Sequence, residues 1–203
     1  MLRIVFSDAR PRDAGRAIFV DRDGVINCRR PGDYVLDWSQ FIFVPGIREA
    51  LRDLSSLQMP MIIISNQAAV GKRLLSPQGL EEITSQLRQT LAADGATLAA
   101  AYYCTHRVED HCECRKPKPA LLQRAAEDFN VELSKSVFIG DSQSDVQAAR
   151  AAGCIPVLFG PGLGAGTDLL EWRTGLSVAL KAPDLFQIVS KRLLGESPAL
   201  RRD

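Results

Sequence analysis

The stretch of sequence that decides the fold reads Ala17-Ile18-Phe19-Val20-Asp21-Arg22-Asp23-Gly24-Val25-Ile26-Asn27. The apolar run at residues 18–20 is too short for a helix and predicts a buried strand. Asp21 and Asp23 follow this run directly. In open α/β sheets, ligands bind beyond the carboxyl ends of the strands. We therefore expect an α/β sheet whose functional site begins at these two carboxylates.

The two carboxylates have a chemistry of their own. Close carboxylates repel each other, so a cation or a shared proton normally accompanies them. Mg²⁺ suits such a pair because it takes oxygen ligands and keeps waters for a substrate phosphate. One aspartate can also act as a nucleophile that forms an aspartyl-phosphate, and the second as a general acid and base. An Asp-Gly turn with solvated carboxylates has the same composition, so the rest of the chain has to decide.

Length and composition describe an ordinary globular protein. The chain has 203 residues, of which 46% are apolar and 24% charged, and its net charge is +1. This charge gives no electrostatic reason to expect nucleic acid or a membrane surface as a partner, and no apolar run is long enough to span a membrane. We expect one domain over residues 1–203, with a loose leader at 1–15 and a frayed tail at 195–203. We also expect a monomer. Its expected location is the cytoplasm, because the N-terminus lacks the apolar centre of a secretory signal.

Further apolar runs also end in polar side chains. Residues 61–64 lead into Ser65-Asn66-Gln67, whose hydroxyl and amides can donate hydrogen bonds to phosphoryl oxygens. Residues 136–139 lead into Gly140-Asp141-Ser142-Gln143-Ser144-Asp145, where we expect Asp141 as a metal ligand and Asp145 as a helix cap or supporting residue. We expect other strands at 41–44, 98–103, 154–159 and 177–180, and helices at 46–57, 76–94, 119–129, 146–152 and 183–194. We expect residues 68–73 to be flexible and 160–166 to form a linker. Alternating strands and helices predict a doubly wound parallel sheet, in which these polar ends converge on one edge.

Cysteine and histidine cluster in one loop. Cys104-Thr105-His106 is followed after five residues by Cys112-Glu113-Cys114. Three thiolates and an imidazole make a complete tetrahedral set, which indicates a structural zinc site with no position left for water. His111 is the alternative nitrogen ligand. The chain has five cysteines, an odd count that favours metal binding in a reducing compartment over a disulfide framework.

Basic residues accompany these motifs. Arg115 and Lys116 follow the last cysteine directly, so a zinc-stapled loop over residues 104–116 would hold them at the mouth of the site. Lys118 competes with Lys116 for the role of a lysine that offsets carboxylate and phosphate charge. Further arginines and lysines could bind a second anionic group of a substrate, although solvated loop side chains would look the same; they are Arg29, Arg30, Lys72 and Arg73.

Taken together, these motifs resemble the haloacid dehalogenase superfamily of phosphatases. The string from Asp21 to Asn27 resembles the subfamily of heptose bisphosphate and histidinol-phosphate phosphatases, and the likeness extends over about residues 17–160. The resemblance implies a Rossmann-like core with a minimal cap. It also implies roles for residues in this chain: catalytic Asp21, Asp23, Ser65 and Lys116; substrate-binding Asn66, Gln67 and Arg115; magnesium ligands Asp21, Asp23 through its backbone, and Asp141; zinc ligands Cys104, His106, Cys112 and Cys114. Arg29 and Arg30 join the expected substrate-binding residues because guanidinium groups suit phosphate, and not through the resemblance.

The activity implied by the resemblance is Mg²⁺-dependent hydrolysis of a phosphomonoester through an aspartyl-phosphate. The expected substrate is the 7-phosphate of D-glycero-D-manno-heptose 1,7-bisphosphate, an intermediate of bacterial surface-sugar (lipopolysaccharide) synthesis. Two alternatives remain open: a phosphatase of histidinol phosphate or another small sugar phosphate, and a zinc-stapled binding protein without turnover. Two departures weaken the substrate assignment. Residues 68–73 differ from the Ser-Gly-Ile-x-Arg-Gly wording of the heptose enzymes, and Ser142 stands where these often have lysine.

Overall fold

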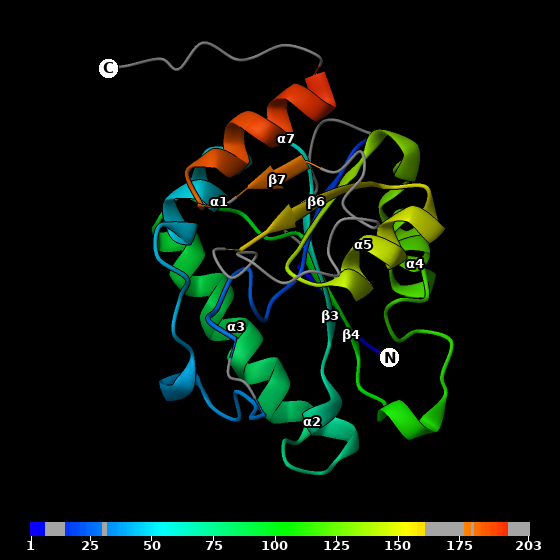
Figure 1. The fold of residues 1–203 in the computed structure, drawn as a ribbon. Coiled ribbons are helices and arrows are strands. Elements are labelled where there is room, and N and C mark those ends of the chain that lie inside the picture. The colour runs from blue at the N-terminus through cyan, green and yellow to red at the C-terminus, as the bar shows by residue number, and fades with distance from the viewer. Residues whose placement is uncertain (7–14, 30–31, 161–176, 180, 195–203) are drawn as a thin grey trace, which may run out of the picture.

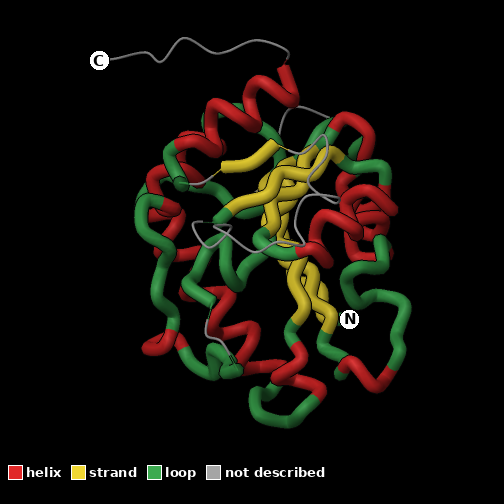
Figure 2. Tube along the Cα trace, in the orientation of Figure 1, coloured by secondary structure: helices red, strands yellow, loops and turns green. Residues whose placement is uncertain are grey.

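A seven-stranded sheet forms the centre of the molecule (Figures 1 and 2). The computed structural model describes residues 1–6, 15–29, 32–160, 177–179 and 181–194. The strands lie in the order β1-β4-β3-β2-β5-β6-β7. Their bounds are β1 Leu2–Val5, β2 Ile18–Val20, β3 Met61–Asn66, β4 Ala100–Cys104, β5 Val137–Gly140, β6 Ile155–Phe159 and β7 Ser177–Ala179. All neighbouring strands pair in parallel except β1, which pairs antiparallel with β4.

Helices cover both faces of the sheet (Figure 1). On one face lie α1 (Ile47–Ser55), α3 (Pro77–Ala93) and α7 (Asp184–Leu194), and on the other lie α4 (Ala120–Phe129) and α5 (Gln143–Ala152). Short helical turns complete the fold: α2 (Ala68–Gly71), η1 (Trp38–Gln40), η2 (Val108–Asp110) and η3 (Leu133–Lys135). No separate cap domain is present in the part of the chain that the structure describes. The prediction of a doubly wound α/β fold is confirmed.

The apolar run before Asp21 is buried on both sides. Ile18 and Val20 pack into the core beneath α1, α3 and α7. Phe19 points the opposite way, into the core beneath α4 and α5. A strand covered on both faces reads as a continuous apolar run rather than an alternating one. This burial explains why three residues suffice to mark the central strand.

Two helix starts follow from capping. The Ser76 hydroxyl accepts a hydrogen bond of 2.9 Å from the Gly79 backbone, and Pro77 occupies the first turn of α3. Ser142 and Asp145 form a reciprocal capping box at the start of α5. These local bonds fix where both helices begin, and therefore where the residues before α5 emerge from the sheet.

Three expectations about local structure are wrong. The leader at residues 1–15 contains a strand, β1, whose alternating half-buried and exposed side chains are those of an edge strand. Residues 41–44 form no strand; Phe41 and Phe43 pack with Trp38 instead, at ring-centroid distances of 4.8 and 6.1 Å from it. Residues 68–73, expected to be flexible, include α2. The tail, Arg30 and all but the first residue of the expected linker at 160–166 lie outside the described residues.

The sheet order reverses between β2 and β5. The chain steps outward from β2 to β3 and β4, returns to β5 on the other side of β2, and continues outward to β6 and β7. Such a reversal opens a crevice at the carboxyl ends of the strands on either side. Asp21, Ser65 and Asp141 all lie at that edge, directly after or at the end of β2, β3 and β5.

Candidate active site

A buried lysine lies between two carboxylates. The Lys116 ammonium group is 2.9 Å from Asp21 Oδ1 and 2.6 Å from Asp145 Oδ1. It also donates a hydrogen bond of 3.0 Å to the Ile64 carbonyl, and Lys116 is only 4% exposed. A buried charge needs such partners to offset its lost hydration. The cation therefore stands next to Asp21, as the sequence predicted.

The backbone of Lys116 is fixed by Asn66. The Asn66 amide accepts from the Lys116 N–H at 3.1 Å and donates to the Lys116 carbonyl at 3.2 Å. Lys118, the competing candidate, instead pairs with Glu113 at 2.8 Å on the surface. The structure thus places Lys116, and not Lys118, in the site.

Burial shifts the acidity of two carboxyl groups. It raises the pKa of Asp21 to about 6, although Lys116 and a hydrogen bond from Ser65 lower it. Burial and the neighbouring Asp21 raise the pKa of Asp141 to about 7, against the lowering effect of Arg29. Both groups therefore lie in surroundings that favour an additional cation.

Donors surround Asp23. The Arg22 guanidinium lies 3.0 Å from Oδ1 and 3.1 Å from Oδ2, Asn27 donates to Oδ1 at 2.9 Å, and Gln67 donates to Oδ2 at 2.7 Å. Burial alone would raise the pKa of Asp23, but the Arg22 charge and the Asn27 and Gln67 bonds hold it below its usual value. Asp23 is thus an ionised, oriented carboxylate beside Asp21.

Asp141 lies close to the turn after β2. Gly24 has a φ of +95°, and a Cβ there would overlap the Asp141 carboxylate. Arg29, predicted to bind substrate, instead places Nη2 2.9 Å from Asp141 Oδ1, with its side chain 54% exposed. Arg29 therefore contacts a predicted magnesium ligand.

The carboxylate cluster fits a hard cation. Oxygen atoms of Asp21, Asp141 and Asp145 lie within 4.8 Å of one another. Asp145 is engaged by Lys116 and by the Ser142 backbone at 3.0 Å, so it acts as a support for Lys116. Asp21 and Asp141 are the members left to face an ion, and carboxylate oxygens are what Mg²⁺ prefers.

A cavity of about 660 Å³ opens at this edge of the sheet. The predicted residues that line it are Asp21, Asp23, Arg29, Ser65, Asn66, Lys72, Arg115 and Lys116. Gln67 is not among the lining residues and is 3% exposed. Arg73 borders a separate surface hollow together with Arg107 and Glu109. The cavity thus joins the acidic pair to several cations.

The structure adds residues that the sequence did not single out. Tyr34 and Ser144 line the cavity, while Arg22 and Asn27 support Asp23 from behind with exposures of only 1% each. The supporting role of Arg22 could have been predicted from its position in the sequence between Asp21 and Asp23. A charged residue at the end of a buried strand, flanked by carboxylates, is expected to pair with one of them.

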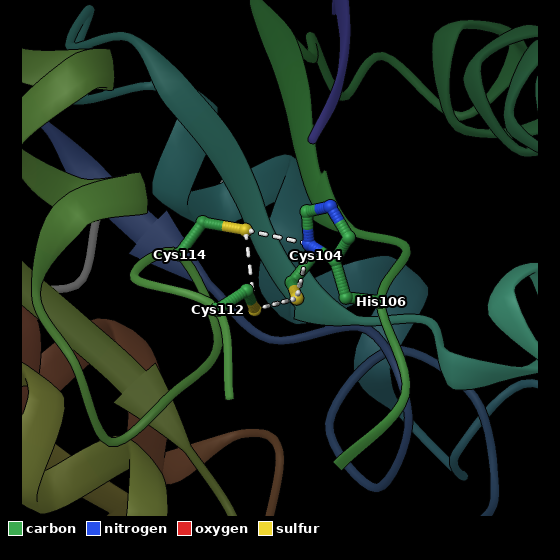
Figure 3. A group of neighbouring side chains, drawn as sticks. All are labelled: Cys104, His106, Cys112 and Cys114. Carbon is green, nitrogen blue, oxygen red and sulfur yellow. Dashed lines mark hydrogen bonds between the residues drawn. The ribbon is translucent and has the colours of Figure 1, made fainter. Parts of the chain in front are cut away.

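The cysteine cluster assembles as predicted (Figure 3). Cys104 Sγ lies 3.5 Å from Cys112 Sγ and 3.7 Å from His106 Nδ1. Cys114 Sγ lies 3.8 Å from Cys112 Sγ and 3.3 Å from His106 Nδ1. Zinc–sulfur bonds of about 2.3 Å in a tetrahedron separate the sulfur atoms by about 3.8 Å. His111 is exposed and outside the cluster, so His106 supplies the nitrogen.

Comparison with known proteins identifies the family. Residues 8–153 match the family of haloacid dehalogenase-like hydrolases. The chain belongs to this family. The expectation of a haloacid dehalogenase-type hydrolase is thereby confirmed, and the motifs around Asp21, Ser65, Lys116 and Asp141 lie within the matched residues.

Curated relatives narrow the class of enzyme. The chain is 37% identical over 150 residues to D-glycero-beta-D-manno-heptose-1,7-bisphosphate 7-phosphatase of Pseudomonas aeruginosa, covering 74% of this chain and 84% of that protein. It is also 37% identical over 149 residues to D-glycero-alpha-D-manno-heptose-1,7-bisphosphate 7-phosphatase of Mycobacterium tuberculosis, covering 70% and 78%. The prediction that this haloacid dehalogenase-like hydrolase is a phosphatase is confirmed.

Solved structures agree on the fold. The crystal structure of D,D-heptose 1,7-bisphosphate phosphatase from B. bronchiseptica, complexed with magnesium and phosphate, superposes with a TM-score of 0.73 at 28% identity. The match covers 85% of this chain and 96% of that one. A haloacid dehalogenase-like protein from Mesorhizobium loti, 20% identical, superposes with a TM-score of 0.76 over 98% of this chain and 95% of that one, and shows the shared fold alone.

Proposed function

We propose that this phosphatase removes the 7-phosphate of a D-glycero-D-manno-heptose 1,7-bisphosphate through an aspartyl-phosphate on Asp21. One observation carries the proposal. A single cavity brings together a nucleophile candidate, a neighbouring acid–base candidate and a buried lysine with the cations Lys72 and Arg115. Relatives that act on either anomer of this bisphosphate support the choice of substrate.

Asp21 and Asp23 divide the chemistry. The Asp21 carboxylate attacks phosphorus, and the bond from phosphorus to the bridging oxygen breaks. Asp23 gives its proton to that oxygen, then takes a proton from the water that hydrolyses the aspartyl-phosphate. Before substrate arrives Asp23 is ionised, but the negative phosphate nearby favours its protonated form.

Ser65 and Lys116 stabilise the transferring group. The Ser65 hydroxyl lies at the end of β3, hydrogen-bonded to Asp21. Lys116 holds its positive charge 2.9 Å from the same carboxylate. Fixed donors and a buried cation next to the attacked phosphorus stabilise charge as it develops on the equatorial oxygens. Asp145 and Asn66 keep the lysine in place.

Two metal ions complete the proposal. Asp21, Asp141 and the backbone carbonyl of Asp23 would hold Mg²⁺, which supplies positive charge against the substrate phosphate and the two carboxylates. The cluster of Cys104, His106, Cys112 and Cys114 would hold Zn²⁺ as a structural ion. It would fix the loop that carries Arg115, whose Nη1 donates to the His106 carbonyl at 3.4 Å.

The cations of the cavity favour a doubly anionic substrate. Lys72 and Arg115 line it, and guanidinium and ammonium groups suit phosphate. Arg29 also lines the cavity, and a bound Mg²⁺ that offsets the charge of Asp141 would leave the Arg29 guanidinium available to the substrate. A cationic substrate such as histidinol phosphate would meet mainly positive charge here. We also propose that the protein is a monomer. We place it in the cytoplasm because none of its five cysteines forms a disulfide, a state that a reducing compartment preserves. Among the described residues, no helix has the length and apolar character to cross a membrane.

The test of the proposed function is phosphate release with Mg²⁺ from a panel of substrates. The panel holds both anomers of the heptose bisphosphate, histidinol phosphate and several hexose phosphates. A kcat/KM for a heptose bisphosphate well above every other member supports the proposal. A preference for histidinol phosphate would overturn the substrate assignment while keeping the mechanism. Release from no member would favour a binding protein.

A further inference from the structure

Gln67 lies behind the catalytic pair and not in the cavity. It follows Ser65 and Asn66 at the end of β3, in the position where a substrate-binding amide was expected. Its residue exposure is 3%, and it does not line the cavity. A side chain that substrate does not reach acts on the reaction through the groups it touches.

Those groups are Asp23 and Ser65. Gln67 Nε2 donates to Asp23 Oδ2 at 2.7 Å and to Ser65 Oγ at 3.2 Å. A primary amide has two N–H donors on one nitrogen, so it can serve both acceptors at once. When the Ser65 oxygen accepts from Gln67, its own hydrogen is left to point toward Asp21, to which Ser65 is hydrogen-bonded. One amide thus orients two groups of the proposed mechanism.

The backbone fixes Gln67 in turn. Its N–H donates to the Cys104 carbonyl at 2.7 Å, at the end of β4. Asn27 donates to the other oxygen of the Asp23 carboxylate and Arg22 to both oxygens, and both side chains are buried. Three donor side chains thus converge on one carboxylate, and a buried hydrogen-bonded network of this kind restrains the orientation of the group it surrounds.

We propose that Gln67 is a positioning residue that aims Asp23 at the leaving-group oxygen and Ser65 at the phosphoryl group. This inference rests on the proposed function. As the phosphorus–oxygen bond breaks, the Asp23 carboxyl passes its proton to the departing alkoxide, and this transfer needs the carboxyl within hydrogen-bond reach. Without Gln67, Asp23 keeps its Arg22 and Asn27 bonds but loses the shorter of the two hydrogen bonds to Oδ2, and only the 3.1 Å bond from Arg22 remains on that oxygen.

The test compares two leaving groups. An alkyl phosphate leaves as a strongly basic alkoxide and needs a proton, whereas 4-nitrophenyl phosphate leaves as a weakly basic phenolate and needs little help. We would measure kcat/KM, which reports aspartyl-phosphate formation, for a heptose bisphosphate and for 4-nitrophenyl phosphate in wild type and Gln67→Met. Since general acid catalysis typically contributes about 100- to 10,000-fold, a misaligned Asp23 should lower the alkyl-to-aryl ratio about tenfold or more. KM for the bisphosphate should change less than about twofold, because no substrate contact is lost.

Controls separate the outcomes. Gln89→Met, on the exposed face of α3, should leave kcat/KM unchanged for both substrates. Gln67→Glu keeps the side-chain shape but removes the paired N–H donors, and it serves if the methionine variant does not fold. A raised KM with unchanged kcat would show a substrate ligand, and an unchanged ratio with lowered Tm would show a purely structural residue; either overturns the proposal. Wild-type protein inactive on both substrates would overturn the proposed function and this inference with it.

Discussion

Lys116 is a buried cation that depends on its neighbours to offset the loss of hydration. Its ammonium group lies between Asp21 and Asp145 and against the Phe138 ring, 5.3 Å from the ring centroid. Burial works against its charge, but the two carboxylates outweigh this and raise the pKa of Lys116 above its usual value. Because it is nearly inaccessible, its removal would leave two buried carboxylates without their cation.

Replacing Lys116 by an apolar side chain of similar length tests its role. Lys116→Met should abolish phosphate release and lower the free energy of unfolding by about 3–5 kcal/mol, the usual effect of breaking a buried ion pair. Urea unfolding followed by circular dichroism measures the second quantity. Lys118→Met removes an exposed pair with Glu113 and should change stability by less than about 1 kcal/mol. Equal effects of the two variants would contradict the described role of Lys116.

The acidic cluster predicts a pH dependence of stability in metal-free protein. The pKa values of Asp21 and Asp141 rise from 3.8 to about 6 and about 7 on folding. A carboxyl group with a raised folded pKa contributes stability below its unfolded pKa and loses it as the pH rises through the folded value. The free energy of unfolding should therefore fall between about pH 4 and pH 7.

A matched variant isolates one member of the pair. Asp141→Asn cannot ionise, so its metal-free stability should fall less over the same interval. At pH 7 it should exceed that of wild type by up to about 4 kcal/mol, because a shift of one pKa unit corresponds to about 1.4 kcal/mol. Added Mg²⁺ should stabilise wild type and leave the variant nearly unchanged. Parallel pH profiles for the two proteins would contradict the assignment.

Among the elements of the fold, the loop between β4 and α4 connects the cysteine cluster to Lys116, the lysine proposed to act in catalysis. Cys104 ends β4, and Cys114 is followed by Arg115 and Lys116. A metal ion bound by Cys104, His106, Cys112 and Cys114 would restrain the loop between residues 104 and 114. The proposed zinc therefore acts on catalysis through the positions of Arg115 and Lys116.

The proposed zinc site can be tested by metal analysis of wild type and of a variant that lacks one ligand. Purified protein should contain about one zinc per chain by elemental analysis, and Cys112→Ser should lose it, lower Tm and reduce kcat/KM. Cys28→Ser changes a cysteine outside the cluster and should retain the metal. Full zinc content in Cys112→Ser would show that the cluster is not the binding site.

The sequence predicted elements where a local signal was strong. The apolar run at residues 18–20 predicted β2, because a strand buried on both faces is continuously apolar. Ser76 and Pro77 predicted the start of α3, because helix capping depends on residues that are adjacent in sequence. β1 was missed because an edge strand with alternating Arg3 and Ile4 is short and half exposed. Phe41 and Phe43 suggested a strand, but their rings serve to cover Trp38. Gln67 looked like a ligand because one sequence position does not tell which way a side chain points.

At the scale of the whole molecule, sheet order brings the site together. Asp21, Ser65 and Asp141 are far apart in the chain but lie on three adjacent strands, β3-β2-β5. The alternation of strands and helices predicted that carboxyl ends share one edge, and so predicted the cluster. The order of strands, and hence which residues are neighbours, is a product of long-range packing that no local pattern records.

The mouth of the cavity is also assembled from distant segments. Lys72 follows α2, Arg115 lies in the cysteine loop, and Tyr34 lies after β2. Arg115→Met should raise KM for a heptose bisphosphate about tenfold while kcat changes little, since a contact to the second phosphate adds binding in ground and transition states alike. Arg52→Met, on the exposed side of α1, is the matched control. An equal rise in KM for a substrate with a single phosphate would argue against a binding site for the second phosphate.

In the proposed mechanism Asp21 becomes phosphorylated during turnover, and rapid-quench mass spectrometry detects this phosphorylation. Protein mixed with heptose bisphosphate and Mg²⁺ is stopped in acid within one turnover, digested and searched for a phosphoryl group. We expect phosphate on the peptide that contains Asp21 in wild type. We expect neither a phosphorylated peptide nor phosphate release in Asp21→Asn. Phosphate release without any phosphorylated peptide, or turnover by Asp21→Asn near the wild-type rate, would contradict this mechanism.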